Sequence, residues 1–93
     1  MRKNAKHKFT NELSVARISR GLSRKAVAKV LDYSRTTPLT HFEQGSRLPN
    51  LTRALQLEII YRRPVAFLFP ELYVSLRNEI RAKEAALKPQ TLF

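Results

Sequence analysis

Apolar residues recur along this chain mainly at intervals of three and four positions. Such intervals place side chains on one side of an α-helix, whereas a half-buried strand requires intervals of two. The pattern therefore predicts an all-α fold, in which Gly, Pro and N-capping residues separate the helices.

The first two predicted helices are short and lie on either side of Gly21. The first has Thr10 or Asn11 as its N-cap and ends at Gly21, because glycine adopts the left-handed conformation without steric cost. The second follows Ser23 as N-cap and ends in the turn at residues 32–34. The predicted inward residues are Leu13, Ala16 and, in part, Ile18 in the first helix, and Val27, Ala28 and Leu31 in the second.

The third predicted helix must accommodate Pro38, which a helix tolerates only in its first turn. We therefore expect Thr36 or Thr37 as its N-cap and Gln44 as its last residue, followed by Gly45 in the left-handed conformation. Its predicted inward residues are Leu39, Phe42 and Glu43.

Three more helices are expected in the rest of the chain. Asn50 caps a fourth helix that runs to about Tyr61 and whose apolar residues surround more than one face, so that we expect it to be covered on two sides. Pro64 starts a short fifth helix that runs through Phe69. The tail then forms an amphipathic sixth helix that ends before Pro89, with apolar residues Leu72, Leu76, Ile80 and Leu87.

Composition narrows the class of partner. Ninety-three residues, 43% of them apolar, indicate one small folded domain. Eighteen Lys and Arg against seven Asp and Glu give a net charge of +11, and residues 1–35 alone hold ten basic and two acidic residues. This excess favours a polyanionic partner over a merely solvated helix surface, although charge does not distinguish DNA from RNA or anionic lipid.

Several functional classes are disfavoured by what the chain lacks. It has no cysteine, which excludes disulfides, thiolate zinc sites and thiol catalysis. His7 and His41 are its only histidines, so we expect no metal site and no cofactor. No activated nucleophile can be placed, so an enzyme is not expected. No segment has the apolar length of a signal peptide or a membrane span, and we expect a cytoplasmic protein without a membrane partner.

The stretches "RISRGLSRKAVAKVL" and "FEQGSRLPNLTRALQLEIIYRRPVAFLF" resemble the Cro and phage-repressor helix-turn-helix family, also called XRE. The resemblance covers about residues 10–70 and is carried by Arg17, Gly21, Leu22, Ser23, Arg24, Glu43, Gly45 and Pro49. The chain departs from the family pattern in having Arg24 where Gln is common, one extra residue between Leu31 and Glu43, and Pro38 inside the expected recognition helix. The register of the base-reading residues is therefore open.

This resemblance implies a five-helix lambda-repressor-like DNA-binding domain at residues 10–70, preceded by a basic arm at 1–9 and followed by a C-terminal amphipathic helix and tail at 71–93. It implies sequence-specific binding of double-stranded DNA by a small transcriptional regulator, a repressor, whose third helix enters the major groove. The expected base-contacting residues are Arg35, Thr36, Thr37, Thr40 and His41. The expected phosphate-contacting residues are Ser23, Arg24, Ser46, Arg47, Lys3, Lys6 and Lys8.

Alternative interpretations accompany these site residues. Thr36 and Thr37 can serve as caps or be solvated, His41 can be a passive surface residue, and the lysines of the arm can be solvated. In such relatives the Glu that matches Glu43 pairs with the Arg that matches Arg17, so the resemblance implies a largely buried Arg17–Glu43 ion pair that fixes the recognition helix.

The resemblance also implies a homodimer, with the sixth helix and the exposed apolar residues of the fourth as candidate surfaces. The alternative is that the sixth helix folds back over the fourth within one subunit. A second functional hypothesis is the antitoxin of a toxin-antitoxin pair, which binds its operator and, through residues 70–93, a toxin protein. A third and weaker one is RNA binding, against which the absence of interleaved aromatic residues on a sheet counts.

Overall fold

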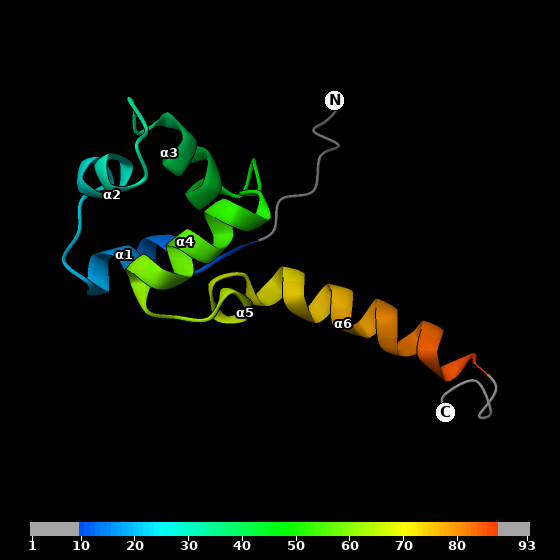
Figure 1. The fold of residues 1–93 in the computed structure, drawn as a ribbon. Helices are drawn as coiled ribbons and strands as arrows, with labels where there is room; N and C mark the ends of the chain where they lie inside the picture. The colour runs from blue at the N-terminus through cyan, green and yellow to red at the C-terminus, as the bar shows by residue number, and fades with distance from the viewer. Residues whose placement is uncertain (1–9, 88–93) are drawn as a thin grey trace, which may run out of the picture.

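A computed structural model of the protein describes residues 10–87, and within this range it contains six α-helices and no strand (Figure 1). The all-α prediction is confirmed. The helices are α1 (Leu13–Ser19), α2 (Arg24–Val30), α3 (Thr37–Gln44), α4 (Leu51–Tyr61), α5 (Val65–Leu68) and α6 (Pro70–Ala85).

Two helix starts are fixed by the side chains that the sequence predicts as caps. Ser23 Oγ accepts a hydrogen bond from Ala26 N at 3.0 Å, and Asn50 Oδ1 accepts one from Arg53 N at 2.8 Å. Each bond satisfies a backbone N–H that has no partner within the first helical turn. The predicted start of α1 is wrong by one residue: the N-cap position falls on Glu12, whose side chain makes no capping hydrogen bond, rather than on Thr10 or Asn11. Asn11 lies just before it, and its Oδ1 accepts a hydrogen bond from Leu13 N at 3.0 Å.

The first three helices end in the same way, with a residue of positive φ that closes a pair of backbone hydrogen bonds. These residues are Gly21 (φ 70°), Asp32 (φ 63°) and Gly45 (φ 78°). After α1, for instance, Gly21 N donates to Ile18 O at 2.8 Å and Leu22 N donates to Arg17 O at 3.1 Å. The predicted ends at Gly21, at residues 32–34 and at Gly45 are therefore confirmed.

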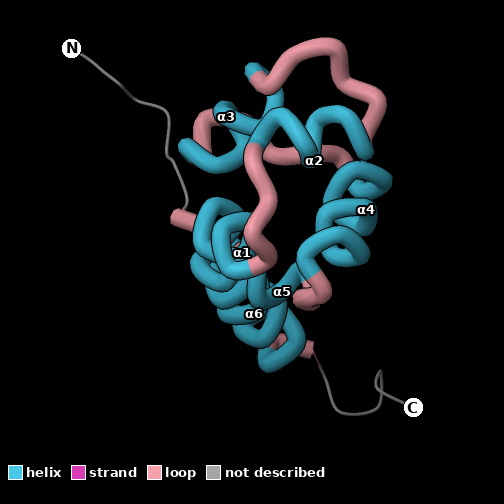
Figure 2. Tube along the Cα trace, turned by 90° about the vertical axis from the view of Figure 1, so that its left-hand side faces the viewer, coloured by secondary structure: helices cyan, strands magenta, loops and turns pink. Residues whose placement is uncertain are grey.

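The core lies where α1 to α5 meet (Figure 2). Its buried side chains come from all of these helices. The buried core residues are Leu13, Ala16, Val27, Ala28, Leu31, Leu39, Phe42, Ala54, Leu57, Tyr61, Leu68 and Phe69. Ile18, which was expected to be partly inward, is 64% exposed because the seven-residue α1 turns only Leu13, Ala16 and Arg17 toward the core.

The sixth helix leaves the core and projects away from α3 (Figure 1). Its start is anchored, since Thr10 N donates to Glu71 Oε1 at 2.7 Å and Leu72 packs in part against the core. None of its residues is buried, and α4 keeps Leu51 and Ile59 more than 70% exposed. The prediction that α4 is covered on two sides, and the alternative that α6 folds back over it, are therefore wrong for this chain by itself.

No helix among residues 10–87 combines the length and the hydropathy that crossing a membrane requires.

Tyr61, at the end of α4, has a titratable phenol and belongs to the buried apolar core. Burial raises the pKa of Tyr61 to about 12, and the carboxylate charge of Glu43 acts in the same direction, whereas the Arg17 charge opposes it. The protonated phenol is therefore favoured more strongly in the folded chain than in the unfolded chain.

We expect this shift to appear as a loss of stability in alkaline solution. Because the folded pKa is raised, the stabilisation is complete below the unfolded pKa of about 10 and is lost as the pH rises toward 12, by roughly 2–3 kcal/mol. Urea denaturation of the parent and of Tyr61→Phe at pH 8 to 12 tests this. The variant lacks the titrating group, so equal pH dependence of the two proteins would contradict the prediction.

Candidate nucleic-acid interface

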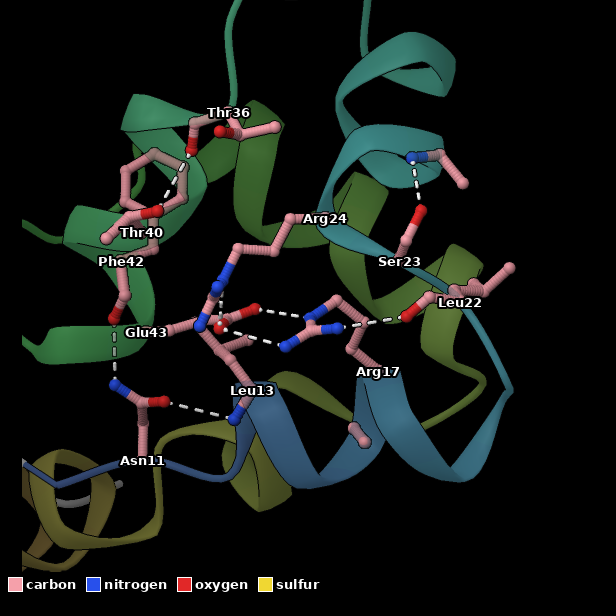
Figure 3. Close-up of polar contacts among 12 residues, drawn as sticks. Asn11, Leu13, Arg17, Leu22, Ser23, Arg24, Thr36, Thr40, Phe42 and Glu43 are labelled. Carbon is pink, nitrogen blue, oxygen red and sulfur yellow. Dashed lines mark hydrogen bonds and ion pairs between the residues drawn. The ribbon is translucent and has the colours of Figure 1, made fainter.

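Glu43 in the last turn of α3 is the centre of the polar contacts between α1, α2 and α3 (Figure 3). Arg17 Nε donates to its Oε2 at 2.7 Å, and Arg17 Nη2 donates to its Oε1 at 3.3 Å. The two side chains are only 10% and 5% exposed. The structure thus forms the buried Arg17–Glu43 ion pair that the resemblance implied.

The hydrogen bond to Glu43 raises the pKa of Arg17, a direction that burial opposes. Arg17 Nη1 also donates to Leu22 O at 3.0 Å, so that its guanidinium spans from α3 to the turn between α1 and α2. A buried charge with several hydrogen-bonded partners is held in one orientation. The pair therefore fixes the direction of α3 relative to α1.

A second arginine meets the same carboxylate. Arg24 Nε donates to Glu43 Oε1 at 2.9 Å, and the side chain of Arg24 is 46% exposed (Figure 3). The sequence predicted Arg24 only as a phosphate contact and did not predict this ion pair. Glu43 on α3 is thus bonded to both α1 and α2. About half of the Arg24 side chain remains exposed to solvent.

Asn11 and Arg53 fix the two ends of the α3 region. Asn11 Nδ2 donates to Phe42 O at 2.9 Å, beside the end of α3. Near its start, Arg53 Nη1 donates to Leu31 O at 2.8 Å, and its guanidinium carbon lies 4.3 Å from the centre of the Tyr33 ring. A cation held over an aromatic face is stabilising. Arg53 on α4 therefore clamps the turn between α2 and α3.

The predicted base-contacting residues extend from the residues just before α3 to His41 in its last turn. Arg35 and Thr37 are exposed, and Thr36, Thr40 and His41 are half-buried. Thr36 stands at the N-cap position but makes no capping hydrogen bond with its side chain, and Thr37 lies inside the helix. The alternative that Thr36 and Thr37 serve as caps is therefore not supported by a side-chain hydrogen bond. The Thr40 hydroxyl is engaged within the helix, since Thr40 Oγ1 donates to Thr36 O at 3.3 Å.

The predicted phosphate-contacting residues divide into three groups. Ser23 and Arg24 lie at the start of α2, where Ser23 Oγ accepts the capping bond described above. Ser46 and Arg47 are exposed in the loop after α3, and Ser46 Oγ lies 3.3 Å from His41 O, to which it donates. Lys3, Lys6 and Lys8 are outside the described residues.

Four residues of this region are not among the site residues predicted from the sequence. Arg53 joins α4 to the turn before α3, and Glu58 Oε1 accepts from Val65 N at 2.9 Å at the start of α5. Lys25 and Lys29 are both exposed on α2 and belong with Arg35 to one basic surface. Lys25 and Lys29 lie four residues apart on one helix with no acidic residue between them, and this spacing could have predicted a shared basic surface from the sequence.

Residues 10–87 contain no group of three or more His, Cys, Asp or Glu side chains that could hold a metal ion. Comparison of the chain with protein-family models, curated proteins and solved structures found no match.

Proposed function

We propose that this protein has a lambda-repressor-like fold and binds double-stranded DNA in a sequence-specific manner, as a small transcriptional regulator of the repressor type. The observation that carries the proposal is the start of α3, where Arg35 and Thr37 are exposed and the Thr36 side chain makes no capping hydrogen bond. The helix itself is held by the contacts of Glu43 and Arg53. A fixed helix with an exposed start fits the major groove, where side chains distinguish all four base pairs.

In this proposal α2 and α3 form a helix-turn-helix. Arg35, Thr36, Thr37, Thr40 and His41 contact bases, and Ser23, Arg24, Ser46 and Arg47 contact phosphates on either side. Arg24 does so with the part of its guanidinium that Glu43 leaves free. The excess of positive charge, +11 over the chain, supplies the attraction that is independent of sequence.

Selection of bound duplexes from a random pool, followed by sequencing, tests the function. We expect a motif of two similar half-sites related by two-fold symmetry and spaced by about one helical turn. A pool that shows no enriched motif would contradict sequence-specific binding. Preferential capture of structured RNA over every duplex in a parallel selection would support the RNA-binding alternative instead.

The homodimer that this motif requires is proposed to form through α6 and the apolar groove at its base. The groove has a volume of about 360 Å³ and is lined only by apolar residues and Tyr73. Leu76 and Ile80 continue along the same helix at 50% and 47% exposure. Residues 70–85 hold three acidic and three basic side chains, so two copies of α6 can approach without the repulsion that the rest of this basic chain would create.

We expect Leu76→Asp combined with Ile80→Asp to convert a dimer into a monomer, because four buried carboxylates would face one another across the interface. Analytical ultracentrifugation of the parent and the double variant measures this. Glu79→Gln combined with Arg81→Gln, at exposed positions on either side of Ile80, is the matched control and should leave the dimer intact. A parent chain that stays monomeric at high concentration and on its selected DNA would contradict the proposed dimer.

The same groove supports the second candidate, an antitoxin that binds a toxin protein through residues 70–93. An apolar groove beside a helix with no buried residues is also the kind of surface on which a different protein docks. Copurification of one small protein with the native chain in a fixed ratio, lost in Leu76→Asp, would favour this candidate over the homodimer.

A further inference from the structure

A shallow hollow lies between α2 and the turn that leads into α3. It has a volume of about 390 Å³. Its polar lining consists of three cationic side chains, from Lys25, Lys29 and Arg35, and three hydroxyl-bearing ones, from Tyr33, Ser34 and Thr36. We refer to this feature as the α2 hollow.

The charge in the α2 hollow is uncompensated within the described part of the chain. No acidic residue lines it. The ion pairs found among residues 10–87 involve Arg17, Arg24, Arg81 and Lys83, and none involves Lys25, Lys29 or Arg35. Like charges four residues apart on a helix, such as those of Lys25 and Lys29, repel each other, and a bound anion reduces this repulsion.

The turn that lines one side of the hollow is held in place before any ligand binds. Tyr33 N donates to Ala28 O at 2.9 Å, which closes the turn onto α2. Arg53 stacks on the Tyr33 ring and donates to Leu31 O, which ties the same turn to α4. A site whose frame is already ordered loses less conformational entropy on binding. The turn and the Tyr33 ring thus form an ordered frame for the hollow, on which the exposed side chains of Lys25, Lys29 and Arg35 stand.

A phosphate group fits this lining best. Its several oxygens accept hydrogen bonds from lysine, arginine and hydroxyl groups together, which is the set that backbone phosphates meet in protein–DNA contacts. Because Arg35 and Thr36 belong both to the hollow and to the start of α3, a phosphate bound there would lie beside the groove that α3 enters.

We propose that the α2 hollow binds a phosphate group, and that in the DNA complex this is a backbone phosphate of the strand flanking the recognition site. The second half of this statement rests on the proposed function. It adds Lys25 and Lys29 to the DNA-contacting residues and assigns Arg35 to phosphate rather than to a base.

The test compares two double variants of the full chain that each lose two positive charges. Lys25→Gln with Lys29→Gln alters the hollow, and Arg63→Gln with Arg77→Gln is the control, at exposed positions without an ion pair in the described structure. Duplex affinity is measured over a series of salt concentrations. We expect the slope of log affinity against log salt to fall by about one in the hollow variant and to be unchanged in the control.

A second measurement separates the sources of phosphate. Inorganic phosphate is titrated into the protein alone while the backbone amide signals of residues 34–36 are followed by NMR. Shifts there that vanish in the hollow variant support the site. If the parent shows these shifts but binds no duplex, the proposed function fails and a small phosphate compound is the ligand.

The proposal itself is overturned if the parent binds duplex but the hollow variant keeps both its slope and its affinity. In that case the proposed function stands and Lys25 and Lys29 are solvated residues. It is equally overturned if the parent neither binds duplex nor responds to phosphate at residues 34–36.

Discussion

Replacing Arg17 with methionine should lower the free energy of unfolding by ~3–5 kcal/mol, because it leaves the Glu43 carboxylate buried without its main partner. The Glu43 side chain is only 5% exposed. Arg24 remains as a second partner, which places the expected loss toward the lower end of this range. Urea denaturation of the parent and the variant measures the effect.

Two matched variants sharpen this experiment. Arg24→Gln removes the second arginine that contacts the Glu43 carboxylate. Because the Arg24 side chain is half exposed, this change should lower the free energy of unfolding by no more than about 1 kcal/mol. Combining Arg17→Met with Glu43→Leu removes both buried charges and should recover most of the stability lost in the single variant. If Arg17→Met were no more harmful than Arg24→Gln, the buried pair would not hold α3.

The second large effect concerns DNA. We expect affinity for the selected duplex to fall about a thousandfold between 50 and 200 mM salt, the dependence of a protein that neutralises roughly six phosphates. The predicted cationic contacts are Arg24, Arg47, Lys3, Lys6 and Lys8, together with Lys25, Lys29 and Arg35, which share one phosphate in the α2 hollow. Fluorescence anisotropy with a labelled duplex gives the slope, and an affinity that does not change with salt would contradict phosphate binding altogether.

The same measurement tests the basic arm. Removal of residues 1–9 should reduce the slope by roughly three if Lys3, Lys6 and Lys8 each neutralise a phosphate. The Arg77→Gln variant, which loses one charge on the projecting α6, should keep the parent slope. An unchanged slope without the arm would assign these lysines to solvent while leaving the contacts made by the helices in place.

Local chemistry made most of the fold predictable. Ser23 and Asn50 cap the helices that they were expected to cap, and Gly21 and Gly45 end theirs in the left-handed conformation. Such features depend on a few neighbouring residues, so the sequence contains them directly. Pro38 was likewise compatible with α3 because it falls within the first turn.

Contacts between distant segments were less predictable. The Arg17–Glu43 pair was expected only because relatives in the resembled family have it, and the addition of Arg24 to that pair depends on how α2 lies against α3. The stacking of Arg53 on Tyr33 joins residues twenty positions apart, and neither residue carries a local signal of it. The exposure of α6 was not evident either, because an amphipathic pattern predicts a covered face without identifying what covers it.

The projecting α6 gives the protein two ends of opposite physical character. The end around α3 concentrates uncompensated cations, whereas α6 carries equal numbers of acidic and basic residues and an apolar groove at its base. Dissolved salt weakens attraction between charges but leaves apolar association intact or strengthens it. Ionic strength therefore acts on the two ends in opposite directions. In the proposed complexes, a single series of salt concentrations would release the nucleic acid from one end while the protein partner stays bound at the other.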